Sequence, residues 1–175
     1  MKKLFKLFLY CLLFVFFTLI LLPKASLYNL LEQELSKQNI VISNEIRDEK
    51  LLNLKLSDAK IYYKGIEGAN IQSINFLSVL VYSKIEVDNI KLLQSLSSFF
   101  PPYIENIIIK HSLLDYRNIT IYSLGDFGVL YGNIDILNRT LILELEASSK
   151  MKREYSKVLK QMKLEEGKYI YEYRF

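Results

Sequence analysis

The residue types of a hydrolase triad come together at one place in the chain. His111 is the only histidine, Ser112 follows it directly, and Asp115 lies shortly after. A triad needs the serine hydroxyl within reach of the imidazole, while a carboxylate holds the other ring nitrogen. Adjacent side chains of a strand point to opposite faces, so Ser112 would face away from His111. The spacing therefore favours a surface histidine at a strand end over a nucleophilic centre.

Carboxylate pairs are the remaining candidates for acid–base chemistry. Asp48-Glu49 and Glu165-Glu166 both fall in apparent turns, where solvated charges are ordinary. The only cysteine is Cys11, so the rest of the chain offers no Cys/His metal site. The sequence has no glycine-rich phosphate loop, G-x-S-x-G elbow or H-E-x-x-H motif. We therefore expect no catalytic residue, no cofactor and no metal, and a protein that is not an enzyme.

An apolar N-terminal run is the strongest signal in the sequence. Three lysines precede 7–22, which is apolar or aromatic except for Thr18, and Pro23 closes the run. A helix over 4–22 would be about 28 Å long, close to a hydrocarbon core of about 30 Å. The residues up to Ala25 form a poor cleavage site for a signal peptidase. The run therefore favours an uncleaved signal-anchor over a signal peptide. The expected anchor residues are Leu4, Leu7, Phe14, Phe17 and Leu22.

Charge and length predict the orientation of the chain, its number of domains and one class of partner that it lacks. The basic residues before the run outweigh Lys24, which predicts a cytoplasmic N-terminus and an exported body. We therefore expect a tip and anchor over 1–24 and one exported domain over 25–175. The net charge is +4, and the N-terminal lysines account for most of it. A nearly neutral body argues against nucleic acid as a partner.

Apolar residues in the body mostly alternate, which predicts a mainly β fold with a minor α component. We expect about eight to ten short strands in a mostly antiparallel sheet, with a short helix near each end. Ser26 can cap the first helix, whose apolar face would hold Leu27, Leu30, Leu31 and Leu35. The second helix would run from Met151 to Leu164 and end at Gly167.

Two features add detail to this sheet. The apolar alternation slips by one residue at Ser57-Asp58, which is typical of a β-bulge and predicts a curved, twisted sheet. Aromatic residues then alternate along a last strand, where they form a core face or, alternatively, a site for an apolar ligand or an interaction partner. These residues are Tyr169, Tyr171, Tyr173 and Phe175.

Several short segments together are similar to a known family. They are Leu-Leu-Pro at 21–23, Leu54-Lys55-Leu56-Ser57-Asp58-Ala59, Gly125-Asp126-Phe127-Gly128, Gly132-Asn133-Ile134-Asp135-Ile136, Leu141-Ile142-Leu143-Glu144-Leu145 and Glu166-Gly167-Lys168-Tyr169. In this arrangement the chain resembles the type II secretion system protein N family and, more loosely, the AsmA-like inner-membrane proteins. The resemblance implies a Gram-negative bacterium, one inner-membrane helix with the C-terminal domain in the periplasm, and no catalysis.

Two functions follow as hypotheses. The first is an accessory or assembly component of a type II-like secretion system, which acts through contacts with other secretion or envelope proteins. The second is an AsmA-like protein for lipid handling or envelope maintenance, whose curved sheet holds acyl chains. The lipid hypothesis requires a strand face that stays apolar after the core has closed. Because a body of this length should have little apolar surface to spare, the sequence favours the secretion hypothesis.

Overall fold

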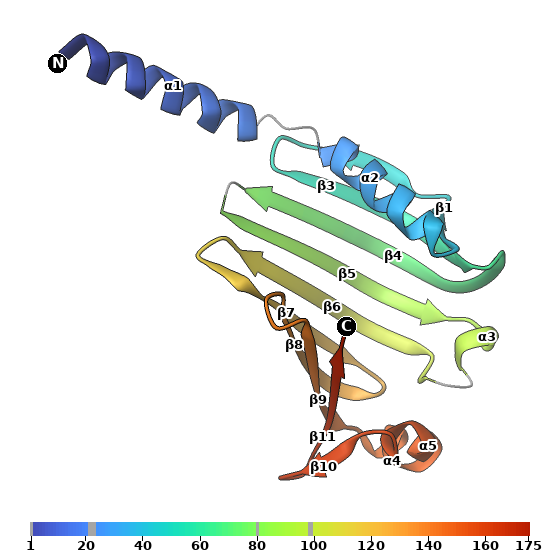
Figure 1. Ribbon diagram of the computed structural model, residues 1–175. Helices are drawn as coiled ribbons and strands as arrows, with labels where there is room; N and C mark the ends of the chain where they lie inside the picture. The colour runs from blue at the N-terminus through green and yellow to red at the C-terminus, as the bar shows by residue number, and fades with distance from the viewer. Residues whose placement is uncertain (1, 21–23, 80, 98–99) are drawn as a thin grey trace.

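A single antiparallel sheet dominates the computed structural model, which describes residues 2–20, 24–79, 81–97 and 100–175. The strand order is β1-β3-β4-β5-β6-β7-β8-β9-β11-β10, and β2 pairs with β3 (Figure 1). The strands are β1 (Ile40–Ser43), β2 (Ile46–Glu49), β3 (Asn53–Tyr63), β4 (Ile66–Val79), β5 (Tyr82–Leu92), β6 (Tyr103–Ser112), β7 (Asp115–Gly125), β8 (Gly128–Asp135), β9 (Thr140–Ala147), β10 (Lys163–Glu165) and β11 (Lys168–Arg174). The mainly β prediction is confirmed.

Short connections between consecutive strands produce this meander. Asp126 and Phe127 alone separate β7 from β8. The apolar alternation over 79–87 and 114–122 predicts Val81 and Leu114 within strands, but the structure places both in turns. Val81 lies in the turn between β4 and β5, and Leu114 lies in the turn before β7, and both are exposed. A hairpin needs residues that leave the ladder, and the alternation of a sequence does not show where that happens.

The predicted slip in β3 is present in the burial pattern. Leu54 and Leu56 are buried, and the next buried residue is Ala59, because Asp58 between them adopts a positive φ of 58°. Asn89 in β5 has a similar φ of 54° and precedes the buried Ile90. A little later in β3, between Ile61 and Tyr62, the pairing register with β4 shifts. Such irregularities raise the local twist of a sheet.

Helix α2 (Lys24–Lys37) covers the first strands of the sheet. Tyr28 is buried in a core cluster with residues of β1, β3, β4 and β5, and Leu35 packs against the same cluster. The predicted apolar face of this helix is partly wrong, because Leu30 is 62% exposed and Leu31 is 38% exposed. The aromatic side chain of Tyr28, which packs at 5.7 Å from the Phe76 ring, takes the central place instead.

The C-terminal helix is shorter than the sequence predicts. It consists of α4 (Ser149–Glu154) and α5 (Ser156–Leu159), and the chain then enters β10. Gly167 does not end a helix: with Glu166 it forms the turn between β10 and β11, where both residues have positive φ. Two such residues in a row are the geometry of a tight hairpin turn, which glycine adopts without strain. Another short helix, α3 (Gln94–Ser97), precedes Pro101.

Helix α1 (Lys2–Ile20) occupies the segment that the sequence predicts as a membrane anchor. In the part of the chain that the structure describes, no helix has both the length and the apolarity that a membrane span requires. The single-pass helix and the inner-membrane placement drawn from it are therefore wrong. Leu22 lies outside the described residues.

Candidate apolar binding face

One face of the sheet carries apolar residues across almost all of its strands. Cross-strand partners in an antiparallel sheet lie on the same face, so the pairing register defines rows that run across the strands. The first row is Leu54, Phe76, Ile85, Ile109, Ile121, Gly132, Leu143 and Tyr171. The second row is Leu56, Ile74, Val87, Ile107, Ser123, Leu130, Leu145 and Tyr169. We call this side of the sheet the apolar face.

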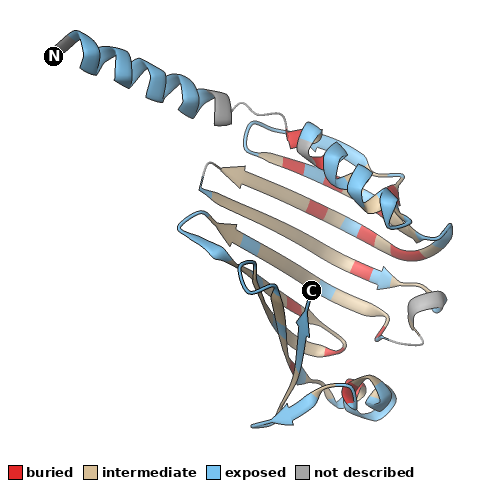
Figure 2. Cartoon of the chain, in the orientation of Figure 1, coloured by how far each residue is buried: buried red, intermediate tan, exposed pale blue. Residues whose placement is uncertain are grey.

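Helices cover the apolar face at its two sides and leave its middle open. Helix α2 packs over β1 and β3, whereas α4 and α5 pack over Phe127 and Leu145 near the other side (Figure 1). The burial pattern follows this arrangement: Leu54 and Leu145 are buried, whereas Ile109 and Ile121 between them are only half-buried. In Figure 2 the strands in the middle of the sheet are mostly of intermediate burial. The hydrophobic face is therefore continuous, while its cover is not.

A cavity of about 360 Å³ lies on the apolar face beside α4 and α5. Its lining residues are Phe100, Ile104, Ile107, Ile121, Ser123, Phe127, Leu130, Leu143, Leu145, Met151, Val158, Gln161, Met162 and Tyr171. The Ser123 hydroxyl donates a hydrogen bond to the Asn106 carbonyl at 2.9 Å, so its donor is already used. This volume falls within the range of about 300–1,000 Å³ that is common for small-molecule sites.

Gly132 shapes the floor of this cavity. A Cβ atom at Gly132 would lie 2.9 Å from Cδ2 of Leu143 and 3.0 Å from Cβ of Ile121. The absence of a side chain lets these two aliphatic residues approach each other across β8. A larger residue at this position would push both side chains out of place.

Helix α4 is fixed above the cavity by polar contacts at its start. The Ser148 hydroxyl accepts a hydrogen bond from the Met151 amide at 3.0 Å and donates one to the Asp126 carbonyl at 2.6 Å. Lys150 forms an ion pair with the Asp126 carboxylate at 2.6 Å. These contacts place the fully buried Met151 side chain against Phe127 and Leu145. The N-cap therefore positions a lid over one part of the apolar face.

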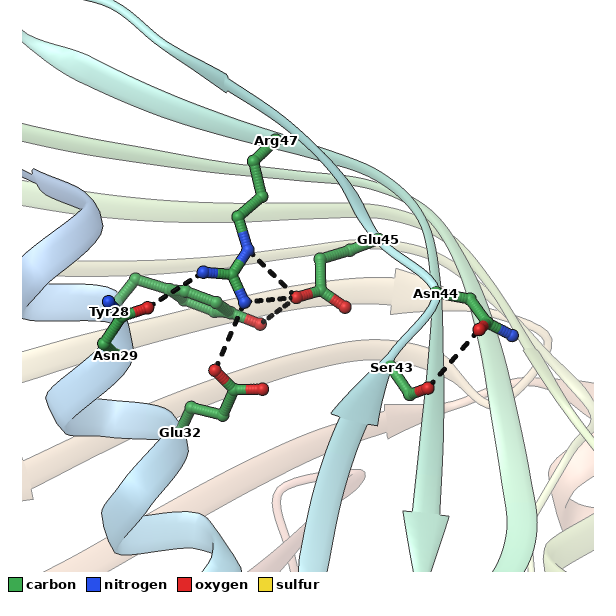
Figure 3. A network of polar contacts seen from close by, with 7 residues as sticks. All are labelled: Tyr28, Asn29, Glu32, Ser43, Asn44, Glu45 and Arg47. Carbon is green, nitrogen blue, oxygen red and sulfur yellow. Dashed lines mark hydrogen bonds and ion pairs between the residues drawn. The ribbon is translucent and has the colours of Figure 1, made fainter.

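Helix α2 is held on the sheet by a network around Arg47, shown in Figure 3. Its guanidinium donates to Glu45 at 2.6 Å, to Asn29 at 2.8 Å and to Glu32 at 3.3 Å. The hydrogen bond to Glu45 raises the pKa of Arg47. Arg47 also lies 4.8 Å from the centre of the Tyr28 ring, a cation–π geometry. The network ties α2 to β2 and the loop before it.

The opposite face of the sheet is mixed: it contains several ion pairs, and Ile108, Tyr122 and Ile142 also lie on it. Lys84 contacts Glu86 at 2.7 Å within β5, and Lys168 contacts both Glu144 and Glu146 from β11. These groups belong to the residues that alternate with the apolar rows along the same strands. The two rows of the apolar face contain no charged residue, and this is what distinguishes that face from the mixed one.

The triad residue types do not converge. The Nε2 atom of His111 lies 3.3 Å from the Tyr116 carbonyl oxygen, whereas the Ser112 hydroxyl donates to the Val81 carbonyl at 3.2 Å. The Asp115 carboxylate accepts hydrogen bonds from the Asn118 amide instead. Among the described residues, no group of three or more His, Cys, Asp and Glu side chains could hold a metal ion.

The aromatic residues of the last strand extend the apolar face to its edge. Tyr169, Tyr171 and Tyr173 pair with Leu145, Leu143 and Leu141 of β9. Phe175 follows β11, and its amide donates to the Arg139 carbonyl at 3.0 Å.

The anchor candidates Leu4, Leu7, Phe14 and Phe17 lie on α1 with side chains 56–73% exposed. Sequence reasoning missed Ile107, Ile121 and Leu130, which only the strand register brings together.

Comparisons with known proteins do not place the chain in a family. No protein-family model matches it, and neither a curated protein nor a solved structure matches it. The similarity to the type II secretion system protein N family and the AsmA-like proteins thus stays a prediction from the sequence.

Proposed function

We propose that this protein binds the acyl chains of a lipid along the apolar face of its sheet and handles lipid without catalysing a reaction. The observation that carries the proposal is the continuous apolar face, left open between α2 and α4–α5. Burial of an exposed aliphatic side chain is worth about 1.5–3 kcal/mol, so a face of this kind favours an apolar occupant.

The chemistry of the cavity supports an acyl chain over a polar ligand. Its lining is almost entirely aliphatic, aromatic or thioether, and Ser123 has no donor to offer because it bonds Asn106. Gln161 is the one amide among the described lining residues, and it belongs to the segment after α5. A sugar or nucleotide would leave its own polar groups unpaired here, whereas an alkyl chain loses no hydrogen bonds on entry.

Direct binding tests this proposal. The full chain is purified in a mild non-ionic detergent and titrated with a fluorescent sixteen-carbon fatty acid. We expect saturable binding that unlabelled fatty acid reverses. A chain that binds neither the probe nor any co-purified lipid detected by mass spectrometry would contradict the proposal.

A matched pair of variants locates the site. Leu143 lines the cavity, whereas Ile142 precedes it in β9 and is 38% exposed on the opposite face. Leu143→Asn should weaken fatty-acid binding by roughly tenfold or more, since an amide in an apolar site costs about 1–3 kcal/mol. Ile142→Asn should bind as the parent does. Equal affinities in two folded variants would place the ligand elsewhere; Ile121→Asn repeats the test if Leu143→Asn unfolds.

The secretion hypothesis is the second candidate from the sequence, and it also requires no catalysis. A role in a type II-like secretion system would depend on contacts with other proteins. It stays a prediction of the resemblance, and the open apolar face is the reason that we place lipid handling first.

A further inference from the structure

The outer edge of β11 is paired along only part of its length. Strand β10 pairs with Lys168 to Ile170, and within the described residues no strand follows on that side of 171–174. The Phe175 amide bonds Arg139 on the β9 side, and backbone groups alternate in direction along a strand. The amide and carbonyl groups of Glu172 and Arg174 therefore point outward from the edge.

The side chains along this edge are exposed and alternate in character. Tyr171 is 38%, Tyr173 is 52% and Phe175 is 58% exposed, on the side of the apolar face. Glu172 and Arg174 alternate with them on the opposite face, with side chains 56% and 80% exposed. Their own ion pair, at 3.6 Å, is too exposed to stabilise the strand appreciably. Both backbone and side chains of the edge are thus available to another strand.

The sequence of the edge is complementary to itself in one antiparallel register. When two copies pair with Tyr173 at the centre, Glu172 of each lies opposite Arg174 of the other. The same register places Tyr171 opposite Phe175. A shift that centres the pair on Glu172 or on Arg174 instead sets like charges against each other, which is unfavourable. A register displaced by a single residue puts the aromatic side chains of the two copies on opposite faces of the joined sheet.

From this complementarity we infer that β11 pairs with β11 of a second copy of the chain, across a two-fold axis at Tyr173. The outward backbone groups of Glu172 and Arg174 then form the ladder hydrogen bonds. The edge that would otherwise attract unrelated strands is closed. The two apolar faces also become continuous, because the row that ends at Tyr171 meets its counterpart through Tyr173. The pairing does not depend on what the apolar face binds.

Disulfide cross-linking tests this register directly in the full chain. Cys11 is first replaced by serine, and Tyr173→Cys then places two thiols at the centre of the pair. Opposed residues without ladder bonds have Cα atoms about 4.5 Å apart, within the range that a disulfide spans. Phe175→Cys is the matched control, because its two copies would lie about 13 Å apart at about 3.3 Å per residue. Both positions are exposed and on the same face.

We expect Tyr173→Cys to form at least tenfold more cross-linked dimer than Phe175→Cys under the same mild oxidation. Equal cross-linking at the two positions, or none at residue 173, would overturn the pairing. Charge reversal supplies the second arm, in the Tyr173→Cys background. Glu172→Arg and Arg174→Glu should each reduce the cross-link, and the double variant should restore it. Single reversals that leave the cross-link unchanged in folded protein would also overturn it.

Discussion

Arg47 donates two hydrogen bonds to one carboxylate oxygen of Glu45, from Nη2 at 2.6 Å and from Nε at 3.1 Å. The Glu45 side chain is only 7% exposed, so it depends on this guanidinium for compensation of its charge. The same guanidinium contacts Asn29 and Glu32 of α2. The Tyr28 hydroxyl of α2 also donates to Glu45, at 3.5 Å, so this carboxylate is coupled to the position of α2 through two side chains.

Arg47→Ala should lower the free energy of unfolding by about 1–3 kcal/mol, because it removes the two guanidinium donors of the buried Glu45 carboxylate. Urea denaturation followed by circular dichroism measures the change. Lys37→Ala is the control: Lys37 pairs with Glu34 at 2.7 Å, but both side chains are more than 60% exposed. That variant should stay within about 0.5 kcal/mol of the parent. Equal losses would show that the network does not hold α2.

Leu145→Ala should destabilise the protein by about 2–5 kcal/mol. Leu145 is 3% exposed and packs with Phe127, Met151 and Leu159 beneath α4 and α5, so truncation leaves a cavity in this core. Ile142→Ala, on the other face of the same strand, should cost much less because Ile142 is already 38% exposed. Thermal melting of both variants distinguishes them, and a reversed order would mean that the assigned faces of β9 are wrong.

Stability should fall as the pH rises above about 10. Burial of Tyr28, followed by the nearby carboxylates of Glu45 and Glu32, raises the pKa of its phenol above the ordinary value of 10.0. The folded state therefore holds this proton more tightly than the unfolded state does. The resulting stability is fully present below pH 10 and is lost as the pH rises through the pKa of the folded state. Tyr28→Phe should show a shallower alkaline decline in unfolding free energy; identical profiles would contradict this account.

Gly167→Ala should destabilise the β10–β11 hairpin by about 1 kcal/mol. Gly167 has a φ of 82°, and a Cβ there would meet no atom within 4 Å. The cost is therefore one of backbone conformation and not of crowding. Gly132→Ala gives the opposite case, since its φ is unremarkable and its Cβ would contact Leu143 and Ile121. Hydrogen exchange of the β11 amides should rise in Gly167→Ala; unchanged exchange would show that the turn tolerates alanine.

Much of the strand content could be read from alternation. The position of β11 agrees with the predicted last strand, because its aromatic residues alternate with mostly polar ones. The C-terminal helix was overextended, since helical spacing from Met151 onward does not show that Lys163 already pairs with Ile170. The exposed surface was also underestimated. The argument from chain length assumes a closed core, whereas this single sheet keeps one face partly open.

The sequence by itself determined which residues are apolar in each strand, where the slip in β3 falls, and that the last strand carries an aromatic row. These properties depend on neighbours in the chain. The tertiary structure alone decided that Ile109, Ile121 and Leu143 lie in one row across the sheet, and that Ile109 and Ile121 stay half-buried. It also decided that a network around Arg47 fastens α2 at one side of the sheet. Register and helix placement depend on pairs far apart in the chain, and local periodicity carries no information about such pairs.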